Sequence, residues 1–363
     1  MALSASTQII DQPPQTRLDG SWLIVSMAKT SLSTLLTRAG LDWFVMALLG
    51  MMGLAGVYPD PGLQEGPLSL ASLASYGVSF IFFFYGLRLN FDELKAGLRN
   101  YRLHLLIHLT TFVFFPALVL TARSLLLTGG SEWLWLGIFY LAALPSTVSS
   151  AVVMVSIAGG NIPAAIFNAS ISSLIGVFIT PVWMSFLLAS TNGQYDLGGV
   201  IGKLTIQVLI PVVLGLLLNR QWGWLAQRYK AYLRYFDQLT ILLIVYTAFC
   251  SSFSLNLYAA YSMGDLLWLT AGLLCLFFLV FGFIQLVCRL LSFSREDSIT
   301  ALFCGSKKSL VQGSVMASVL FPVTVAGVAL LPIILYHTLQ LIAASVIAQA
   351  MAHRQQKVID IGG

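Results

Sequence analysis

Charged residues are scarce in this chain, since only 9% of its 363 residues are Asp, Glu, Lys or Arg. Acidic residues are the rarer sign, 14 against 19 basic ones, and each of them falls in a loop or at the end of an apolar run. With 58% hydrophobic residues and a mean hydropathy of +0.87, the composition lies far outside that of soluble globular proteins. The ten-residue alternating segments of a transmembrane β-barrel are absent. The sequence therefore predicts an all-α polytopic membrane protein.

Cysteine is also rare, and its placement argues against metal chemistry. The four cysteines (Cys250, Cys275, Cys288 and Cys304) lie far apart within apolar runs and lack the spacing of metal ligands. The histidines are few, scattered and unaccompanied by carboxylates. A hydrolase nucleophile elbow, a phosphate-binding loop and a metalloprotease helix are all missing. We therefore expect no enzyme, no cofactor and no dedicated metal site.

Ten apolar runs reach about the twenty residues needed to cross a hydrocarbon core. They are 41–58, 68–89, 102–126, 133–157, 161–190, 198–219, 235–256, 264–291, 298–320 and 322–352. Arg123 and Lys203 fall on one side of this arrangement, and every other basic residue except one lysine pair falls on the opposite side. By the positive-inside rule both termini are cytoplasmic, in the plasma (inner) membrane if the source is bacterial. This asymmetry explains the net charge of +5 without a nucleic-acid partner.

The ten runs divide into two blocks of five, residues 38–191 and 196–354. A cytoplasmic or interfacial leader at 1–37 precedes them, and a cytoplasmic tail at 355–363 follows. Because each block holds an odd number of runs, the second block enters the membrane from the opposite face. Any structural repeat would then have inverted topology, as in many secondary transporters.

The fourth run of each block contains a polar interruption. In the first block it is Leu144-Pro145-Ser146-Thr147-Val148-Ser149-Ser150, and in the second it is Gly305-Ser306-Lys307-Lys308-Ser309. Proline removes a backbone hydrogen bond at mid-span, and hydroxyl groups can satisfy the carbonyls that it frees. Paired interrupted spans at corresponding positions are a sequence signal for a binding site near the membrane midplane.

Two adjacent lysines, Lys307 and Lys308, lie in the second interruption. An ammonium at membrane depth costs about 2.5–3.5 kcal/mol on insertion scales, so such groups usually face a polar interior. The nearest acidic residues, Glu296 and Asp297, lie only at the entrance of that run. The lysines are predicted either to meet an anionic ligand or to neutralise the carbonyl ends of broken helices.

The candidate site collects polar residues from both interruptions. The first half-site would contain Ser146, Thr147, Ser149, Ser150 and Asn168, and the second would contain Ser306, Lys307, Lys308 and Ser309, with His337 and Gln340 alongside. For each there is a structural alternative: serines permit close helix packing, and an isolated amide or imidazole often bonds a neighbouring helix.

The same residues carry a resemblance to a known family. The segments are Pro145-Ser146-Thr147-Val148-Ser149-Ser150-Ala151-Val152, Gly159-Gly160-Asn161, Ala164-Ala165-Ile166-Phe167-Asn168, Phe303-Cys304-Gly305-Ser306-Lys307-Lys308-Ser309-Leu310, Tyr336-His337 with Gln340, and Tyr85-Gly86-Leu87. Together they resemble the sodium/bile-acid cotransporter superfamily (solute carrier family ten), most of all its seventh-member branch and bacterial relatives.

The resemblance implies ten helices in two inverted five-helix repeats, a panel domain and a core domain, crossing discontinuous helices and alternating access. The bile-acid branch places sodium ligands at the crossing, including a glutamate and a glutamine from the ninth helix. Here Ser306-Lys307-Lys308-Ser309 offers neither residue.

We therefore expect a secondary active transporter of a small anionic organic solute, with the lipid bilayer and that solute as its partners. Sodium is the one candidate metal ion, but its site would consist of neutral oxygens beside two lysines. Protons are the second candidate for coupling, because desolvation and a neighbouring like charge both favour a neutral amine. The third alternative is that both lysines stay charged and the carrier is a uniporter or exchanger without ion coupling. The alternative function is a non-transporting membrane regulator of calcium handling or of envelope and glycan biosynthesis.

Overall fold

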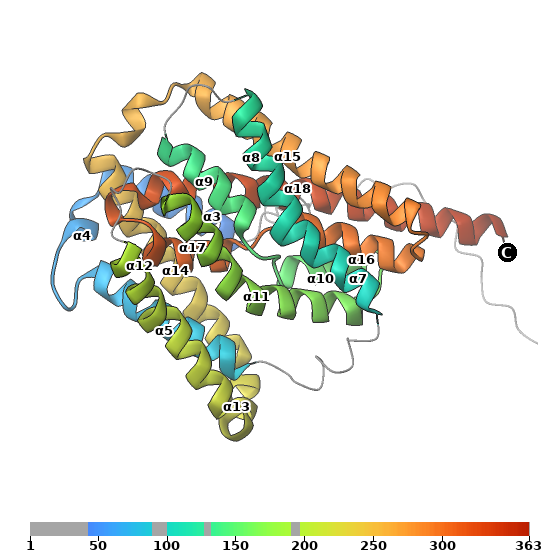
Figure 1. The fold of residues 1–363 in the computed structure, drawn as a ribbon, viewed down its shortest axis with the longest axis horizontal. Helices are drawn as coiled ribbons and strands as arrows, with labels where there is room; N and C mark the ends of the chain where they lie inside the picture. Colours follow the sequence, from blue (N-terminus) through green and yellow to red (C-terminus); the bar gives the residue numbers. More distant parts are fainter. Residues whose placement is uncertain (1–42, 89–99, 127–131, 190–196, 363) are drawn as a thin grey trace, which may run out of the picture.

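The computed structural model describes residues 43–88, 100–126, 132–189 and 197–362, and the predicted leader at 1–37 lies outside them. The described residues form helices and loops without a strand (Figure 1). The helices are α3 (Trp43–Val57), α4 (Asp60–Leu63), α5 (Leu70–Leu87), α7 (Tyr101–Leu109), α8 (Phe115–Leu126), α9 (Glu132–Ala143), α10 (Ser149–Ala158), α11 (Ile162–Ala189), α12 (Leu197–Leu204), α13 (Ile210–Arg228), α14 (Lys230–Ser254), α15 (Met263–Leu290), α16 (Arg295–Ser306), α17 (Leu310–Leu320) and α18 (Val323–Gly362), with a short 3-10 helix at Leu257–Ala260. Two π-helical turns, Thr110–Phe114 and Thr205–Leu209, join α7 to α8 and α12 to α13.

Every predicted apolar run contains one or two of these helices. By length and composition, seven helical stretches in the described part of the chain suffice to cross a membrane. They are Leu70–Leu87, Tyr101–Arg123, Ile162–Leu187, Gly202–Arg228, Lys230–Ser254, Met263–Leu290 and Val323–His353. The prediction of a polytopic α-helical membrane protein is confirmed.

The two predicted interruptions are real breaks in the helices. In the fourth run α9 ends at Ala143 and α10 begins at Ser149, and in the ninth run α16 ends at Ser306 and α17 begins at Leu310. The backbone of Lys307 is extended there, with φ −94° and ψ 144°. Each fourth run is therefore a pair of short helices whose ends lie inside the protein.

The helices pack as two groups. The α5 group consists of α3, α5, α12, α13 and α14, and the α18 group consists of α7 to α11 and α15 to α18. The groups meet where α14 packs on α17 and α18, and where α17 packs on α5 and α12. Both broken runs belong to the α18 group.

Glycines allow an unusually close approach within the α5 group. A Cβ atom on Gly215 would contact the main-chain oxygen of Phe83, and one on Gly86 would contact the main-chain oxygen of Val212. Helices in membranes pack tightly where small residues let their backbones meet. A salt bridge of 3.0 Å between Arg88 and Asp237 also joins α5 to α14.

The α18 group is tied together where the α10–α11 turn meets the start of α16. Gly159 adopts the left-handed conformation (φ 74°) that ends α10. The Asn161 side-chain amide donates to Asp297 Oδ1 at 2.9 Å, and that of Asn100 donates to Asp297 Oδ2 at 2.8 Å. The Asp297 carboxylate therefore links the start of the second broken run to the turn that follows the first broken run and to the residue before α7.

Candidate functional site

The two helix breaks lie against each other in the buried interior of the α18 group. The Ser309 N–H donates to the Pro145 carbonyl at 2.9 Å. The carbonyl ends of α9 and α16 and the N-terminal ends of α10 and α17 thus come together. Since each helix end leaves backbone groups without intrahelical partners, this region depends on side chains to satisfy them. We call it the crossing.

Lys308 satisfies two carbonyls at the end of α9. The Ser146 N–H donates to the Ser172 hydroxyl at 2.9 Å, so it is not directed at the carbonyl of Ala142 four residues back. Lys308 Nζ donates to that Ala142 carbonyl at 2.6 Å and to the Leu144 carbonyl at 2.8 Å. An ammonium at this position is favoured because the carbonyl end of a helix carries partial negative charge.

The third acceptor of Lys308 is the Thr111 carbonyl, which lacks a helical donor because of a proline. In the π-helical turn the Phe115 N–H donates to Thr110 O, five residues back. Pro116, which would donate next, has no N–H, so the Thr111 carbonyl is left without a helical donor. Lys308 Nζ donates to Thr111 O at 2.8 Å and lies 4.1 Å from the centroid of the Phe115 ring.

These contacts use every proton of the Lys308 ammonium, because a lysine has three donors and here three carbonyls accept them. The side chain is 1% exposed. Of the two roles predicted for the lysine pair, neutralising carbonyl ends is the one that fits the Lys308 geometry.

Gln340 on α18 forms hydrogen bonds with the main chain of Lys308. The Lys308 N–H donates to Gln340 Oε1 at 2.8 Å, and Gln340 Nε2 donates to Lys308 O at 2.8 Å. Gln340 Nε2 also lies 3.0 Å from His337 Nδ1, so that ring nitrogen acts as an acceptor. His337 and Gln340 are thus brought to the crossing as predicted, where they position the second break.

Other side chains close the remaining helix ends. The Thr180 hydroxyl donates to the Ala143 carbonyl at 2.8 Å, and the Tyr336 hydroxyl donates to the Ser306 carbonyl at 2.8 Å. The Ser306 hydroxyl donates to Leu302 O within α16. Ser306 therefore lies at the crossing, with both its main-chain and its side-chain oxygen in hydrogen bonds.

Lys307 differs sharply from its neighbour. Its side chain is 0% exposed, and Nζ has no hydrogen-bond partner among the described residues. It lies within electrostatic range of Cys304 and His337. A buried ammonium without an acceptor is strongly unfavourable. Lys307, not Lys308, is the lysine with donors left for a ligand.

Sequence reasoning missed Gln312, whose side chain also lies at the crossing. Its Nε2 donates to Ser173 O at 2.8 Å, while its Oε1 has no partner among the described residues. The Ser146 hydroxyl is buried and likewise has no partner in the described part of the chain. The sequence signal for Gln312 is the Ser-x-x-Gln pattern from Ser309 to Gln312, which is typical of a helix N-terminus. In the structure the Ser309 hydroxyl is the N-cap of α17 and accepts from the Gln312 N–H.

The remaining predicted residues have other environments. Asn168 Oδ1 lies 3.0 Å from His104 Nδ1, and its Nδ2 donates to Ala164 O, so it joins α11 to α7. Thr147 and Ser150 are half-buried, and the Ser150 hydroxyl donates to Thr147 Oγ1 at 3.5 Å. The side chain of Ser149 lies outside the described residues.

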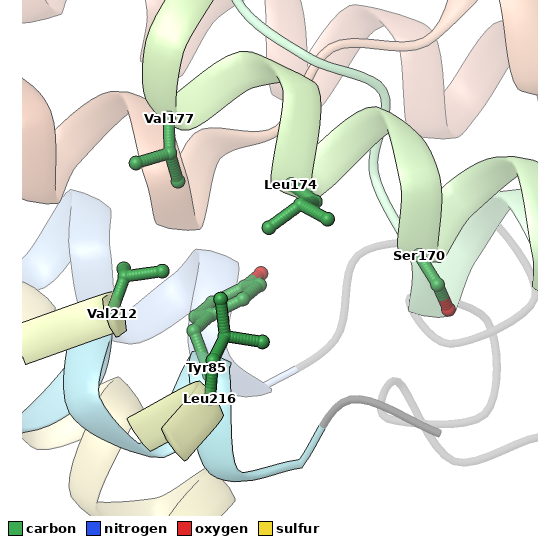
Figure 2. Close-up of a pocket in the computed structure, with 7 residues that line it drawn as sticks. Tyr85, Ser170, Leu174, Val177, Val212 and Leu216 are labelled. Atoms are coloured by element: carbon green, nitrogen blue, oxygen red, sulfur yellow. The ribbon is translucent and has the colours of Figure 1, made fainter. Parts of the chain in front are cut away.

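A cavity lies between the two helix groups near the C-terminal end of α5. Tyr85, Gly86, Ser170, Leu174, Val177, Val212 and Leu216 line it. Its interior volume is about 20 Å³, room for roughly one water molecule, and it is partly open to the surroundings. Figure 2 shows the Tyr85 hydroxyl pointing toward Leu174 on α11, with Leu216 beside the ring. This mostly apolar cavity separates α5 and α13 from α11.

A second cavity lies between the groups near the N-terminal end of α5. Ala71, Ala74, Ser75, Lys203, Gln207, Ile244, Thr247, Ala248, Ser318, Phe321, Val323 and Ala326 line it. Its interior volume is about 200 Å³, it is again partly open, and it contains the exposed Lys203. Ser75 and Tyr85 are ten residues apart on one helix, so the two cavities are offset by about 15 Å along α5.

Within the described parts of the chain, no group of three or more His, Cys, Asp or Glu residues is placed to hold a metal ion. The oxygens that a cation could use at the crossing are carbonyls, hydroxyls and the Gln312 amide.

Comparisons with known proteins agree with this architecture. Residues 42–353 match the sequence profile of the SBF-like CPA transporter family. An uncharacterized protein of Pseudomonas aeruginosa is 40% identical, over 86% of this chain and 94% of its own length. The putative symporter YfeH of Escherichia coli K12 is 35% identical, over 88% and 95%. The mouse sodium/bile acid cotransporter 7 is 32% identical, over 89% and 97%.

Proposed function

Because the chain belongs to the SBF-like CPA transporter family, within the bile acid:sodium symporter superfamily, we propose that it is a secondary active transporter of a small anionic organic solute that works by alternating access. The α5 group would be the panel domain and the α18 group the core domain of a ten-helix protein with inverted repeats. Both termini would be cytoplasmic, on the side that carries most basic residues.

The observation that carries the proposal is the pair of cavities at opposite ends of α5. Each cavity is lined by residues of both helix groups, and no residue of the crossing lines either cavity. A movement of the α18 group along the α5 group would open one cavity further as it closes the other. The crossing would then be exposed to the two sides of the membrane in turn.

Lys307 supports an anionic solute. Its ammonium is buried and lacks an acceptor, and a carboxylate or another anionic group would supply one. The oxygens of Ser146 and Gln312 that lack partners among the described residues would bind the polar, proton-donating parts of the same solute. Lys308, Gln340 and Tyr336 would keep the break in the shape that presents Lys307.

Three alternatives are open for coupling: sodium, protons, and no ion coupling, as in a uniporter or an exchanger. The sodium/bile acid cotransporter names of relatives favour sodium, and neutral oxygens at the crossing would have to hold it. The buried Lys307 and the adjacent His337 favour protons, because both side chains can gain and lose one.

The experiment begins with a thermal-shift screen of the purified protein against organic anions, with and without sodium. A stabilising anion is then tested for counterflow in liposomes. We expect counterflow that is lost in Lys307→Ala and kept in Lys230→Ala, because Lys230 is an exposed lysine at the start of α14. Uptake driven by a pH gradient without sodium identifies proton coupling, and uptake that needs a sodium gradient identifies sodium coupling.

Two results would overturn the proposal. One is a folded protein that binds no organic anion and shows no counterflow, which would favour the non-transporting regulator. The other is counterflow that is equal in Lys307→Ala and the unaltered protein, which would remove Lys307 from the solute site.

A further inference from the structure

The surroundings of the Lys308 ammonium are those of a bound monovalent cation. The carbonyl oxygens of Thr111, Ala142 and Leu144 lie at 2.8, 2.6 and 2.8 Å, and the Phe115 ring face lies at 4.1 Å. We call these four groups the carbonyl cage. We propose that the carbonyl cage is a monovalent-cation site that the chain fills with its own side chain, and that removal of the side chain opens it to a free primary alkylammonium ion.

The cage is made by the backbone, so it does not depend on Lys308 for its composition. Thr111 O is free because Pro116 has no N–H, and Ala142 O is free because the Ser146 N–H donates to Ser172. These causes persist when residue 308 is changed. A variant without the amine would therefore keep three oxygens that lack donors, and unsatisfied buried carbonyls are unfavourable.

The chemistry of the cage selects its occupant. Three acceptors and an aromatic face match a primary ammonium, which has three N–H donors and a cationic charge. Replacing Lys308 with alanine keeps Cβ and removes three methylene groups with the amine, so n-propylammonium has the shape of what is lost. Tetramethylammonium has the same charge and no N–H, so it cannot satisfy the carbonyls.

Lys307 provides a matched control in the adjacent position. It has the same side chain and the same complete burial, yet its Nζ contacts no acceptor among the described residues. Truncation of Lys307 also opens a space of the same volume, but that space has no set of carbonyls around it. A general effect of amines on detergent-solubilised protein would appear in both variants.

The proposal goes beyond the transport function and does not rest on it, since its readout is the stability of purified protein. In the intact protein the cage is occupied whenever the chain is folded.

The test measures the melting temperature of the full chain in detergent at constant ionic strength. We expect Lys308→Ala to melt below the unaltered protein. Its melting temperature should rise with the logarithm of n-propylammonium concentration, as linkage to a bound ligand requires. Tetramethylammonium should have no such effect on Lys308→Ala, and n-propylammonium none on Lys307→Ala or the unaltered protein.

A folded Lys308→Ala that n-propylammonium does not stabilise overturns the proposal, as does equal stabilisation of Lys307→Ala. If Lys308→Ala aggregates during purification, membranes are solubilised in the presence of each amine. Monodisperse protein recovered with n-propylammonium and not with tetramethylammonium supports the proposal. Aggregation with both amines overturns it.

Discussion

The side-chain amide of Gln340 pairs with the main chain of Lys308 in both directions, with 2.8 Å for each hydrogen bond. The two residues are 32 positions apart, on α18 and in the break between α16 and α17. An amide is the side chain that offers a donor and an acceptor together, as a neighbouring backbone would. Gln340 therefore fixes the extended backbone of the break, which directs the Lys308 ammonium into the carbonyl cage.

Replacing Gln340 with leucine should destabilise the protein strongly. The change keeps the volume but leaves a buried N–H and a buried C=O of Lys308 without partners, at about 1–3 kcal/mol each. Thermal unfolding in detergent measures the loss. Gln349→Leu, on an exposed part of the same helix, is the control; it removes one hydrogen bond to the Ser345 hydroxyl and should cost about 1 kcal/mol or less. Equal melting temperatures for the two variants would contradict the assigned role.

Two glycine substitutions, one at the contact between α5 and α13 and one on α15, should change stability in opposite directions. Gly215→Ala places a methyl group against the main chain of Phe83, so the helices must separate, at about 1–3 kcal/mol or more. Gly272→Ala on α15 meets nothing within 4 Å and should stabilise its helix by about 0.5–1 kcal/mol. Melting temperatures measure both, and a stabilising Gly215→Ala would show that the helices are not in such close contact.

Asp297 should be needed to hold the two broken runs together. Asp297→Ala removes both acceptors of the Asn161 and Asn100 amides, and hydrogen bonds to charged groups contribute about 1.5–3 kcal/mol. Glu296→Ala removes an exposed carboxylate from the same helix turn, which controls for the interaction with the helix N-terminus. We expect a lower melting temperature for Asp297→Ala alone. Similar losses in both variants would point to the helix terminus as the cause.

The two cavities predict accessibility from opposite sides of the membrane. With the exposed Cys275 replaced by alanine and the three buried cysteines kept, one cysteine introduced at a time at Ser75 or Ser170 probes the two cavities. An impermeant maleimide should label Ser75→Cys from the side of Lys203 and Ser170→Cys from the cytoplasmic side. Labelling in intact cells and in inverted vesicles measures this, and labelling of both positions from one side would contradict alternating access.

The helical content and both breaks were predictable because their causes are local. Each apolar run is long enough to be helical in a membrane, and Pro145 or a group of polar residues marks each interruption. The structure confirms helices in every run and breaks within residues 144–150 and 305–309. The division into inverted repeats and the membrane orientation stay predictions.

The partners at the crossing were less predictable, because they depend on contacts between distant segments. The sequence did not show which of Lys307 and Lys308 would face a ligand, and only the fold separates them. Lys308 reaches carbonyls 164 to 197 residues away, whereas Lys307 reaches none. Gln312 lies inside α17, beyond the polar segment 305–309, and its place at the crossing depends on a contact with Ser173, 139 residues away. Asn168 was assigned to the site, but its amide joins α11 to α7.

The carbonyl cage has a consequence for biosynthesis. Ala142 is synthesised 166 residues before Lys308, the residue whose ammonium satisfies its carbonyl. At 5–20 residues per second, that interval is roughly 8 to 33 s. During this time the end of α9 would be in or near the membrane without its final partner, so water or the insertion machinery would have to satisfy its carbonyls. The first half of the protein therefore becomes complete only when the ninth run arrives, and a chain that ends before Lys308 would present an unfilled cage to quality control.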